Sequence, residues 1–190
     1  MKKAMRNISG FVLMAGILFT IASCGTSKKA VNSDEEVLIA TYCSGDQYNS
    51  NAKVFRFTGI GESMDQMTAK KKAMSEARAG LAASINTKVK SVTDNYVKSG
   101  NFNNKEELLK NYEGISREVV DQNLAGVIVI CEKMTKTKAG TYKSYVCLEL
   151  GGSEILQSLN NKMSNNEMLK VDYNYEKFKK TFDEEMSKNQ

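Results

Sequence analysis

Residues 127–150 read VIVICEKMTKTKAGTYKSYVCLEL and decide the fold, because they hold two apolar segments that can pair as a β-hairpin. The strands are predicted at residues 127–134 and 141–150, where β-branched and aromatic side chains are frequent. Lys138, Ala139 and Gly140 lie between them, and a three-residue turn with a final glycine is typical of a hairpin with a bulge. The other elements are assigned around this hairpin.

The turn also fixes the register of the two strands. Positions symmetric about residue 139 face each other, so Cys131 is predicted directly opposite Cys147. Both faces of the hairpin are then apolar, and helices cover only one of them, so the other needs the C-terminal segment, another strand or a partner. The first face comprises Ile128, Ile130, Val146, Leu148 and Leu150, and the second comprises Val127, Val129, Cys131, Tyr145 and Cys147.

The facing cysteines, Cys131 and Cys147, form a candidate disulfide pair. Directly opposite residues of antiparallel strands have Cα atoms about 4.5–5.5 Å apart, which a disulfide tolerates. Two such cysteines can also pack as small hydrophobic side chains, and Cys43 competes for a bond with either. Cys43, Cys131 and Cys147 are three thiols, so at least one of them stays free or pairs outside the chain.

Short strands and a long helix are predicted before the hairpin. Residues 37–43 and 54–60 read as strands, and residues 43–46 between them as a turn. The sequence SMDQ at residues 63–66 has the pattern of a capping box, so a helix is expected from there to about Val97. Its small residues indicate a close approach of the helix backbone to a neighbour. The expected buried stripe consists of Met67, Ala69, Ala73, Met74, Ala77, Leu81, Ala83, Ile85, Val89, Val92 and Tyr96.

Two further helices are predicted from a capping residue followed by apolar residues at helical spacing. Asn104 begins a second helix that ends near Asn123, with Leu108, Tyr112, Ile115 and Val119 along one face. A third capping box at residues 164–167 precedes Leu169, Tyr173, Phe178, Phe182 and Met186, which mark one helical face. Packing of that face onto its own domain is favoured over partner binding.

The sequence therefore predicts an α+β fold. Its antiparallel sheet of three or four strands packs on two long helices in the order β-α-α-β-β, and C-terminal helices follow.

The first 24 residues have the pattern of a lipoprotein export signal. Basic residues stand at positions 2, 3 and 6, and the apolar run at residues 8–21 has 14 residues, whereas a membrane-spanning helix needs about 20. Ile21-Ala22-Ser23-Cys24 then resembles the lipobox of bacterial lipoproteins, which implies cleavage before Cys24 and its acylation. An ordinary secretory signal cut near Ser23 is the alternative.

The expected organisation is a signal peptide at residues 1–23, a lipidated tether at 24–36, an α+β domain at 37–156 and a C-terminal helical extension at 157–190. Gly25, in place of an aspartate after the lipidated cysteine, resembles the version of the signal that directs lipoproteins to the outer membrane. The sequence does not determine which face of that membrane the protein occupies.

Composition argues against several classes of function. Removal of residues 1–23 leaves 24 basic and 22 acidic residues, a net charge of +2, so nucleic acid is not an expected partner. The chain has no histidine, which excludes Ser-His-Asp triads, Cys-His pairs and histidine metal ligands. The cysteines lack zinc-site spacing. We therefore predict no catalytic residue, no cofactor and no metal site.

Two further motifs also favour a structural interpretation. Gly59-Ile60-Gly61 before a helix suggests a phosphate loop, but Met64 replaces the third glycine and Glu62 would repel a pyrophosphate. The lysines at residues 70–72 span most of a helical turn, and such runs are usually solvated surface and not anion sites.

Several segments together resemble the LPP-twenty family of envelope lipoproteins. They are Cys43-Ser44-Gly45, Phe55-Arg56, Gly59-Ile60-Gly61-Glu62-Ser63, the helical positions Ala69, Lys70, Ala73, Ala77, Arg78 and Leu81, and Tyr145-Val146-Cys147-Leu148-Glu149. The resemblance covers about residues 37–156. It implies an α+β module, related to an N-terminal domain of flagellar-assembly proteins, with no assigned catalytic centre.

The leading functional hypothesis is a non-enzymatic binding or envelope-assembly module tethered to the outer membrane. The partner is another envelope protein or a second copy, and the expected contact surface contains Val127, Val129 and Tyr145 unless the C-terminal helix covers it. The alternatives are a carrier of a small ligand between helices and sheet, or an enzyme that uses Cys43 or a lysine base.

The anchor prediction is tested by replacing Cys24. Cys24→Ser removes the acylated sulfur, so labelling with radioactive palmitate should be lost and the folded domain should leave the membrane fraction. Labelling of Cys24→Ser at the level of the unaltered protein would contradict the lipobox interpretation.

Overall fold

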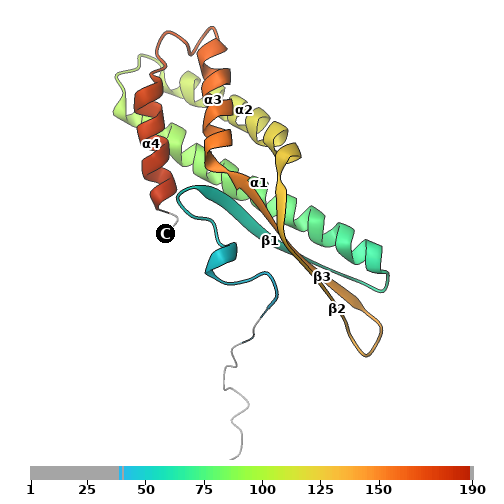
Figure 1. Ribbon diagram of the computed structural model, residues 1–190. Coiled ribbons are helices and arrows are strands. Elements are labelled where there is room, and N and C mark those ends of the chain that lie inside the picture. Colours follow the sequence, from blue (N-terminus) through green and yellow to red (C-terminus); the bar gives the residue numbers. More distant parts are fainter. Residues whose placement is uncertain (1–38, 40, 189–190) are drawn as a thin grey trace, which may run out of the picture. The chain divides into compact units, whose positions relative to one another are not determined.

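The computed structural model describes residue 39 and residues 41–188, and in these residues three strands and four α-helices form an α+β fold (Figure 1). The predicted fold class is therefore confirmed. The strands are β1 (Val54–Ser63), β2 (Ile128–Lys136) and β3 (Tyr142–Gly151). The helices are α1 (Gln66–Ser99), α2 (Lys105–Asn123), α3 (Gly152–Asn165) and α4 (Tyr175–Ser187), and two 3-10 turns are η1 (Asp46–Tyr48) and η2 (Leu124–Gly126).

The sheet is antiparallel with the order β1-β3-β2, so the strand that is last in sequence lies in the centre. β1 agrees with the strand predicted at residues 54–60 and extends it to Ser63. The strand predicted at residues 37–43 is wrong where it can be compared, because residues 39 and 41–43 are not in a strand and the chain turns at 42–43. The rest of that segment lies outside the described residues.

The hairpin has the predicted register, with Cys131 opposite Cys147. Gly140 has a φ of 91°, which glycine tolerates, and the Thr137 N–H donates to the Thr141 carbonyl at 2.9 Å across the turn. A register shift between Val129 and Cys131 leaves Ile130 as an extra residue on β2.

This bulge makes the predicted face assignment wrong at the start of β2. Ile130 packs with the cysteines instead of with Val146, and Val127 packs against the main core instead of with Cys131. Beyond the bulge the assignment holds, since Val146, Leu148 and Leu150 belong to the main core and the cysteines lie on the opposite face.

α1 lies directly on β1, with almost no side chain between the two backbones. A Cβ atom added to Gly59 would lie 2.3 Å from the Ala73 carbonyl oxygen, and one added to Gly61 would lie 2.2 Å from that of Ala69. Ala69, Ala73 and Ala77 are fully buried at this contact. The close approach expected from the small residues is therefore confirmed.

Two details of the α1 prediction are wrong. Met67 and Ala83 are exposed, because the buried stripe follows Ala69 and Ala73 at four-residue steps towards Leu81. The helix is capped by Asp65, whose carboxylate accepts from the Thr68 N–H at 2.8 Å, and not by a hydroxyl at residue 63.

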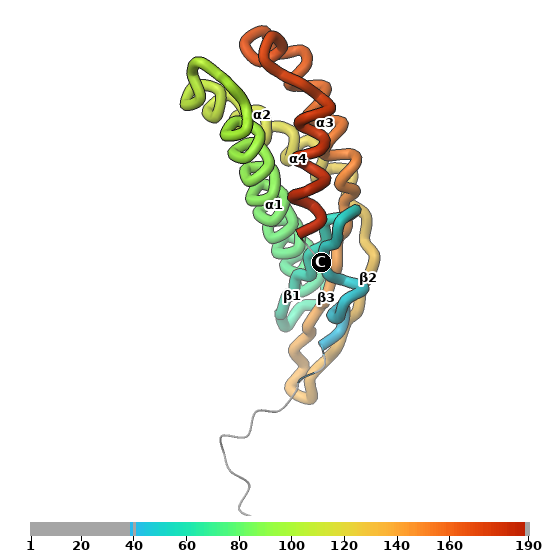
Figure 2. The backbone as a smooth tube through the Cα atoms, turned by 90° about the vertical axis from the view of Figure 1, so that its left-hand side faces the viewer, coloured from blue at the N-terminus to red at the C-terminus, as the bar shows by residue number. Residues whose placement is uncertain are grey.

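α2 begins and ends as predicted, with Asn104 as its N-cap. It packs on α1 and α3 and not mainly on the sheet, so the prediction of two long helices against the sheet is correct only for α1 (Figure 2). α3 follows β3 without a loop, and this helix already crosses the boundary predicted between residues 156 and 157.

The third predicted capping box is wrong, because residues 164–165 form the end of α3 and not the start of a helix. α4 starts at Tyr175, after the N-cap Asn174, whose side-chain oxygen accepts from the Lys177 N–H at 2.9 Å. The apolar C-terminal residues do pack onto their own domain, as favoured. Leu169, Phe178, Phe182 and Met186 are buried in the main core, and Tyr173 packs against it.

A buried carboxylate fastens α4 to α1. Glu185 is 5% exposed, and its side chain accepts from Ser91 Oγ and Asn95 Nδ2 at 2.8 Å each and pairs with Lys188. The hydrogen bond from Lys188 is the main cause that lowers the pKa of Glu185. α4 is thus positioned by a polar contact as well as by apolar packing.

The contact between β1 and α1 predicts opposite effects for two glycine substitutions. Gly59→Ala should destabilise the fold by about 3 kcal/mol, since the new methyl group meets helix backbone that cannot move aside. Gly114→Ala, in α2 with nothing within 4 Å, should stabilise it by about 0.5–1 kcal/mol. Urea unfolding of both variants measures this, and a Gly59→Ala variant as stable as Gly114→Ala would contradict the contact.

Candidate functional site

The face of the sheet opposite α1 is covered by residues 41–50, a segment that we call the strap (Figure 1). Cys43 in the strap forms a disulfide with Cys131 of β2, with Cα atoms 5.7 Å apart. The Thr58 hydroxyl of β1 donates to the Cys43 carbonyl at 2.8 Å, and the Ser50 hydroxyl bonds both the N–H and the carbonyl of Arg56. The strap therefore spans the sheet and is bonded to both of its outer strands.

The predicted pairing of Cys131 with Cys147 is corrected by this disulfide. Their predicted proximity is right, since the two residues are register partners, but the sulfur of Cys131 is bonded to Cys43 and Cys147 keeps a free thiol. The reason lies in a reversal of the chain at residues 42–45, which overlaps the turn predicted at residues 43–46. With φ of 54° at Cys43 and 101° at Gly45, the chain folds back over the sheet and brings a third cysteine onto the pair.

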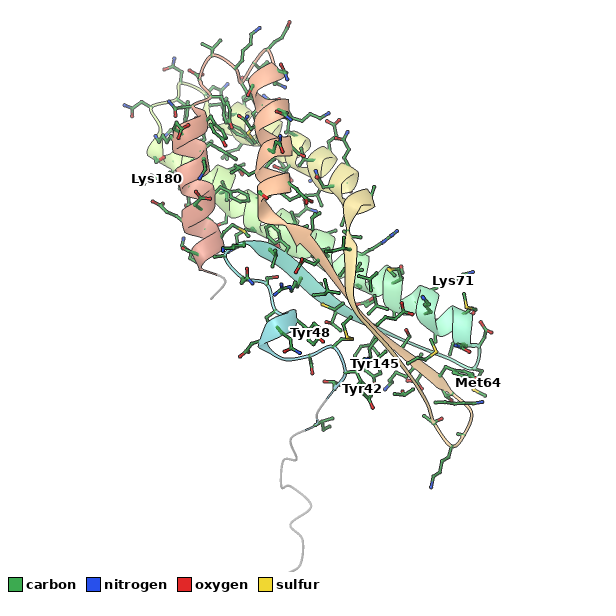
Figure 3. The ribbon with its side chains drawn as sticks, viewed as in Figure 1. Tyr42, Tyr48, Met64, Lys71, Tyr145 and Lys180 are labelled. Carbon is green, nitrogen blue, oxygen red and sulfur yellow. A yellow bond between two sulfur atoms is a disulfide. The ribbon has the colours of Figure 1, made fainter. Side chains whose placement is uncertain are left out.

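The side chains under the strap form a small second core. Cys43, Cys131, Tyr145 and Cys147 are all buried there, and the ring of Tyr42 packs edge-on against Tyr145 at 5.4 Å between centroids (Figure 3). Burial raises the pKa of the Cys147 thiol. A thiol with a raised pKa is a poor nucleophile at neutral pH, so the chemistry of this cluster is that of packing.

A cavity of about 360 Å³ lies between the strap and β1. On its floor Arg56 pairs with Glu149 of β3 at 2.6 Å, with both side chains about four-fifths buried. Arg56 also donates to the Asn49 carbonyl at 3.3 Å, so the guanidinium holds the strap to the sheet. The charges in this cavity are already engaged with protein partners.

The predicted contact surface of Val127, Val129 and Tyr145 is not one continuous surface. Tyr145 is 9% exposed beneath the strap, and Val127 packs against the main core. Of the three residues only Val129 is exposed, at 47%. Its neighbour Ile128 is 55% exposed.

These two residues belong to the outer edge of the sheet. β2 pairs only with β3, and among the described residues no backbone hydrogen bond joins its outer edge to another segment. The edge of β1 differs, because the Asn51 N–H donates to the Val54 carbonyl at 3.0 Å and Ser50 bonds Arg56. The open edge of β2, with Ile128 and Val129 beside it, is the candidate functional site.

The geometry bears on the other chemistries considered from sequence. Within residues 41–188 no group of three His, Cys, Asp or Glu residues is placed to hold a metal ion, and no helix there is long and apolar enough to span a bilayer. Cys43, considered as a nucleophile, is engaged in the disulfide. Between β1 and α1 the contacts of Gly59 and Gly61 leave no room for a carried ligand.

An open cavity of about 600 Å³ lies elsewhere, between α1 and α2. Its lining carries charges of both signs, from Lys90, Asp94, Glu113 and Arg117. The cavity therefore favours neither an anionic nor a cationic ligand.

Sequence reasoning missed the strap and the open edge. The available signal for the strap was the turn at residues 43–46, which reverses the chain immediately after a cysteine. The open edge was not predicted because the hairpin sequence does not show which of its two strands pairs with β1.

Comparison with known proteins gives little further information. No family model matches the chain, and no curated protein matches it. Among solved structures the chain is similar to the secreted protein HP1454 from Helicobacter pylori, with 18% sequence identity and a TM-score of 0.29. The match covers 57% of this chain and 35% of that chain, and at this level it carries no argument about function.

The disulfide assignment predicts how cysteine variants behave. Cys43→Ser should abolish the crosslinked peptide and lower the stability by up to about 4 kcal/mol, since the bond closes a loop with a sequence separation of 88. Cys147→Ala is the matched control and should keep both the crosslink and its sensitivity to reductant. Peptide mapping without reductant, combined with thermal melting, measures both effects, and a crosslinked peptide that contains Cys147 would refute the assignment.

Proposed function

We propose that the chain is an outer-membrane lipoprotein, anchored through acyl chains on Cys24, whose folded part binds another envelope protein without catalysing a reaction. The lipobox resemblance supports the anchor. The open edge of β2 is the observation that carries the binding proposal, because an unpaired strand edge offers a row of N–H and C=O groups to an extended segment.

The proposed contact is the addition of a partner strand along residues 128–131. Main-chain hydrogen bonds to β2 supply affinity, and the exposed Ile128 and Val129 contact alternate side chains of the partner. Beyond the bulge, Glu132, Lys133 and Lys136 are exposed on β2, and such charges discourage pairing along its whole length. The apolar start of the strand is therefore the favoured place for contact.

This edge is held rigid before any partner binds. β2 is fixed on one side by its pairing with β3 and from above by the Cys43–Cys131 bond. An ordered edge loses little conformational entropy on binding, which favours affinity.

Charge placed at the edge tests this proposal. The double variant Ile128→Lys/Val129→Lys should lose its crosslinked partner in pull-downs from detergent-solubilised membranes, because the added ammonium groups oppose strand addition. Val171→Lys, at an 82% exposed position between α3 and α4, controls for a lysine added on the surface away from the edge and should retain the partner. Both variants should melt like the unaltered protein.

Two results would overturn the proposal. One is retention of every crosslinked partner by the double variant, and the other is equal loss from the Val171→Lys control. If the sole species captured is a second copy of this chain, sedimentation of the purified protein will show the dimer, and the partner is then the chain itself.

A further inference from the structure

We propose that a basic, methionine-lined groove on α1 docks the folded part onto an anionic phospholipid surface. This inference rests on the proposed lipid anchor and adds a second contact with the membrane. The groove has a volume of about 400 Å³. Its lining residues are Met67, Lys70, Lys71, Met74, Ser75 and Arg78.

The charge of this helix segment favours an anionic surface. Between residues 66 and 93, α1 carries six basic residues and a single acidic one, Glu76. Lys71 and Arg78 are exposed and make no ion pair with any described residue, whereas Lys70 is neutralised by Glu132 of β2 at 2.6 Å. Free cations at the mouth of the groove are thus available to lipid phosphates.

The apolar part of the groove suits acyl chains. Met67 of the groove is 58% exposed, and Met64, which lies outside the groove just before α1, is 70% exposed. Met64 lies against the hairpin turn, with its Sδ 3.4 Å from Thr141 Oγ1, and the exposed Lys138 belongs to the same turn. Long flexible thioether side chains flanked by cations form the pattern of an interfacial membrane contact.

The proposed anchor keeps this surface near the bilayer. The 15 Cα-to-Cα steps from Cys24 to Ile39 (39 − 24) span at most about 50 Å when the chain is fully extended. A tethered contact forms at high effective concentration, so a patch with weak intrinsic affinity is sufficient. Along residues 70–78 the backbone groups of α1 are used in helical hydrogen bonds, so a contact governed by charge and apolar insertion fits the groove better than an added strand does.

The experiment measures vesicle binding by the unacylated chain from residue 24 with Cys24→Ser, which keeps every described residue. Flotation with vesicles of phosphatidylglycerol and phosphatidylcholine should show binding that weakens with salt, whereas phosphatidylcholine alone should bind little. The variant Lys71→Glu/Arg78→Glu should lower the partition coefficient about tenfold or more. Lys170→Glu/Lys180→Glu, at the α4 end, changes net charge equally and should have little effect.

A second pair of variants tests the methionines. Met67→Gln should weaken binding, whereas Met168→Gln, at a 55% exposed position after α3, should not. Circular dichroism checks that each variant is folded.

Failure to bind the anionic vesicles, or equal loss with the α4 control, would overturn the proposal. Such a result would leave the anchor and the β2 edge untouched, because the assayed chain carries no acyl group and no partner protein is present.

Discussion

The structure depends on one contact, the approach of the α1 backbone to the backbone of β1 at Gly59 and Gly61. Added Cβ atoms at these glycines would lie within 2.4 Å of backbone atoms in α1, so no other residue fits without moving the helix. The alanines at residues 69, 73 and 77 provide the matching flat surface of the helix. Small residues on both elements thus determine where the helix lies, and larger side chains fill the core beyond them, from Leu81 onward.

This contact explains why the two faces of the sheet are covered so differently. One long helix covers the first face, and the C-terminal half of that helix carries α2 and α4 (Figure 2). No α-helix covers the other face within the described residues, and its small core of cysteine and tyrosine side chains has only the strap above it. A segment of this length buries little apolar area, so the disulfide and the hydrogen bond from Arg56 to the Asn49 carbonyl add the constraint that packing does not supply.

Periodicity and turn chemistry made α1, α2 and the hairpin predictable, whereas α3 and the start of α4 were not predicted. The helix from Lys105 to Asn123 and the pairing of Cys131 with Cys147 in register both follow from local spacing. The bulge at Ile130 and the partner of Cys43 did not follow, because each depends on where a distant segment meets the sheet. The same limit applies to the candidate site, since the open edge of β2 is a consequence of strand order.

The two surfaces proposed for binding adjoin at a specific ion pair. Lys70 belongs to the groove of α1 and its partner Glu132 belongs to β2, with 2.6 Å between Nζ and Oε1. If the groove rests on lipid, a strand added to β2 therefore lies beside the bilayer surface. That position suits a partner that is itself anchored or embedded in the membrane, because both proteins are then confined to the same thin layer and meet at high effective concentration. Charge would set the orientation of the domain, and backbone pairing at the edge would set the choice of partner.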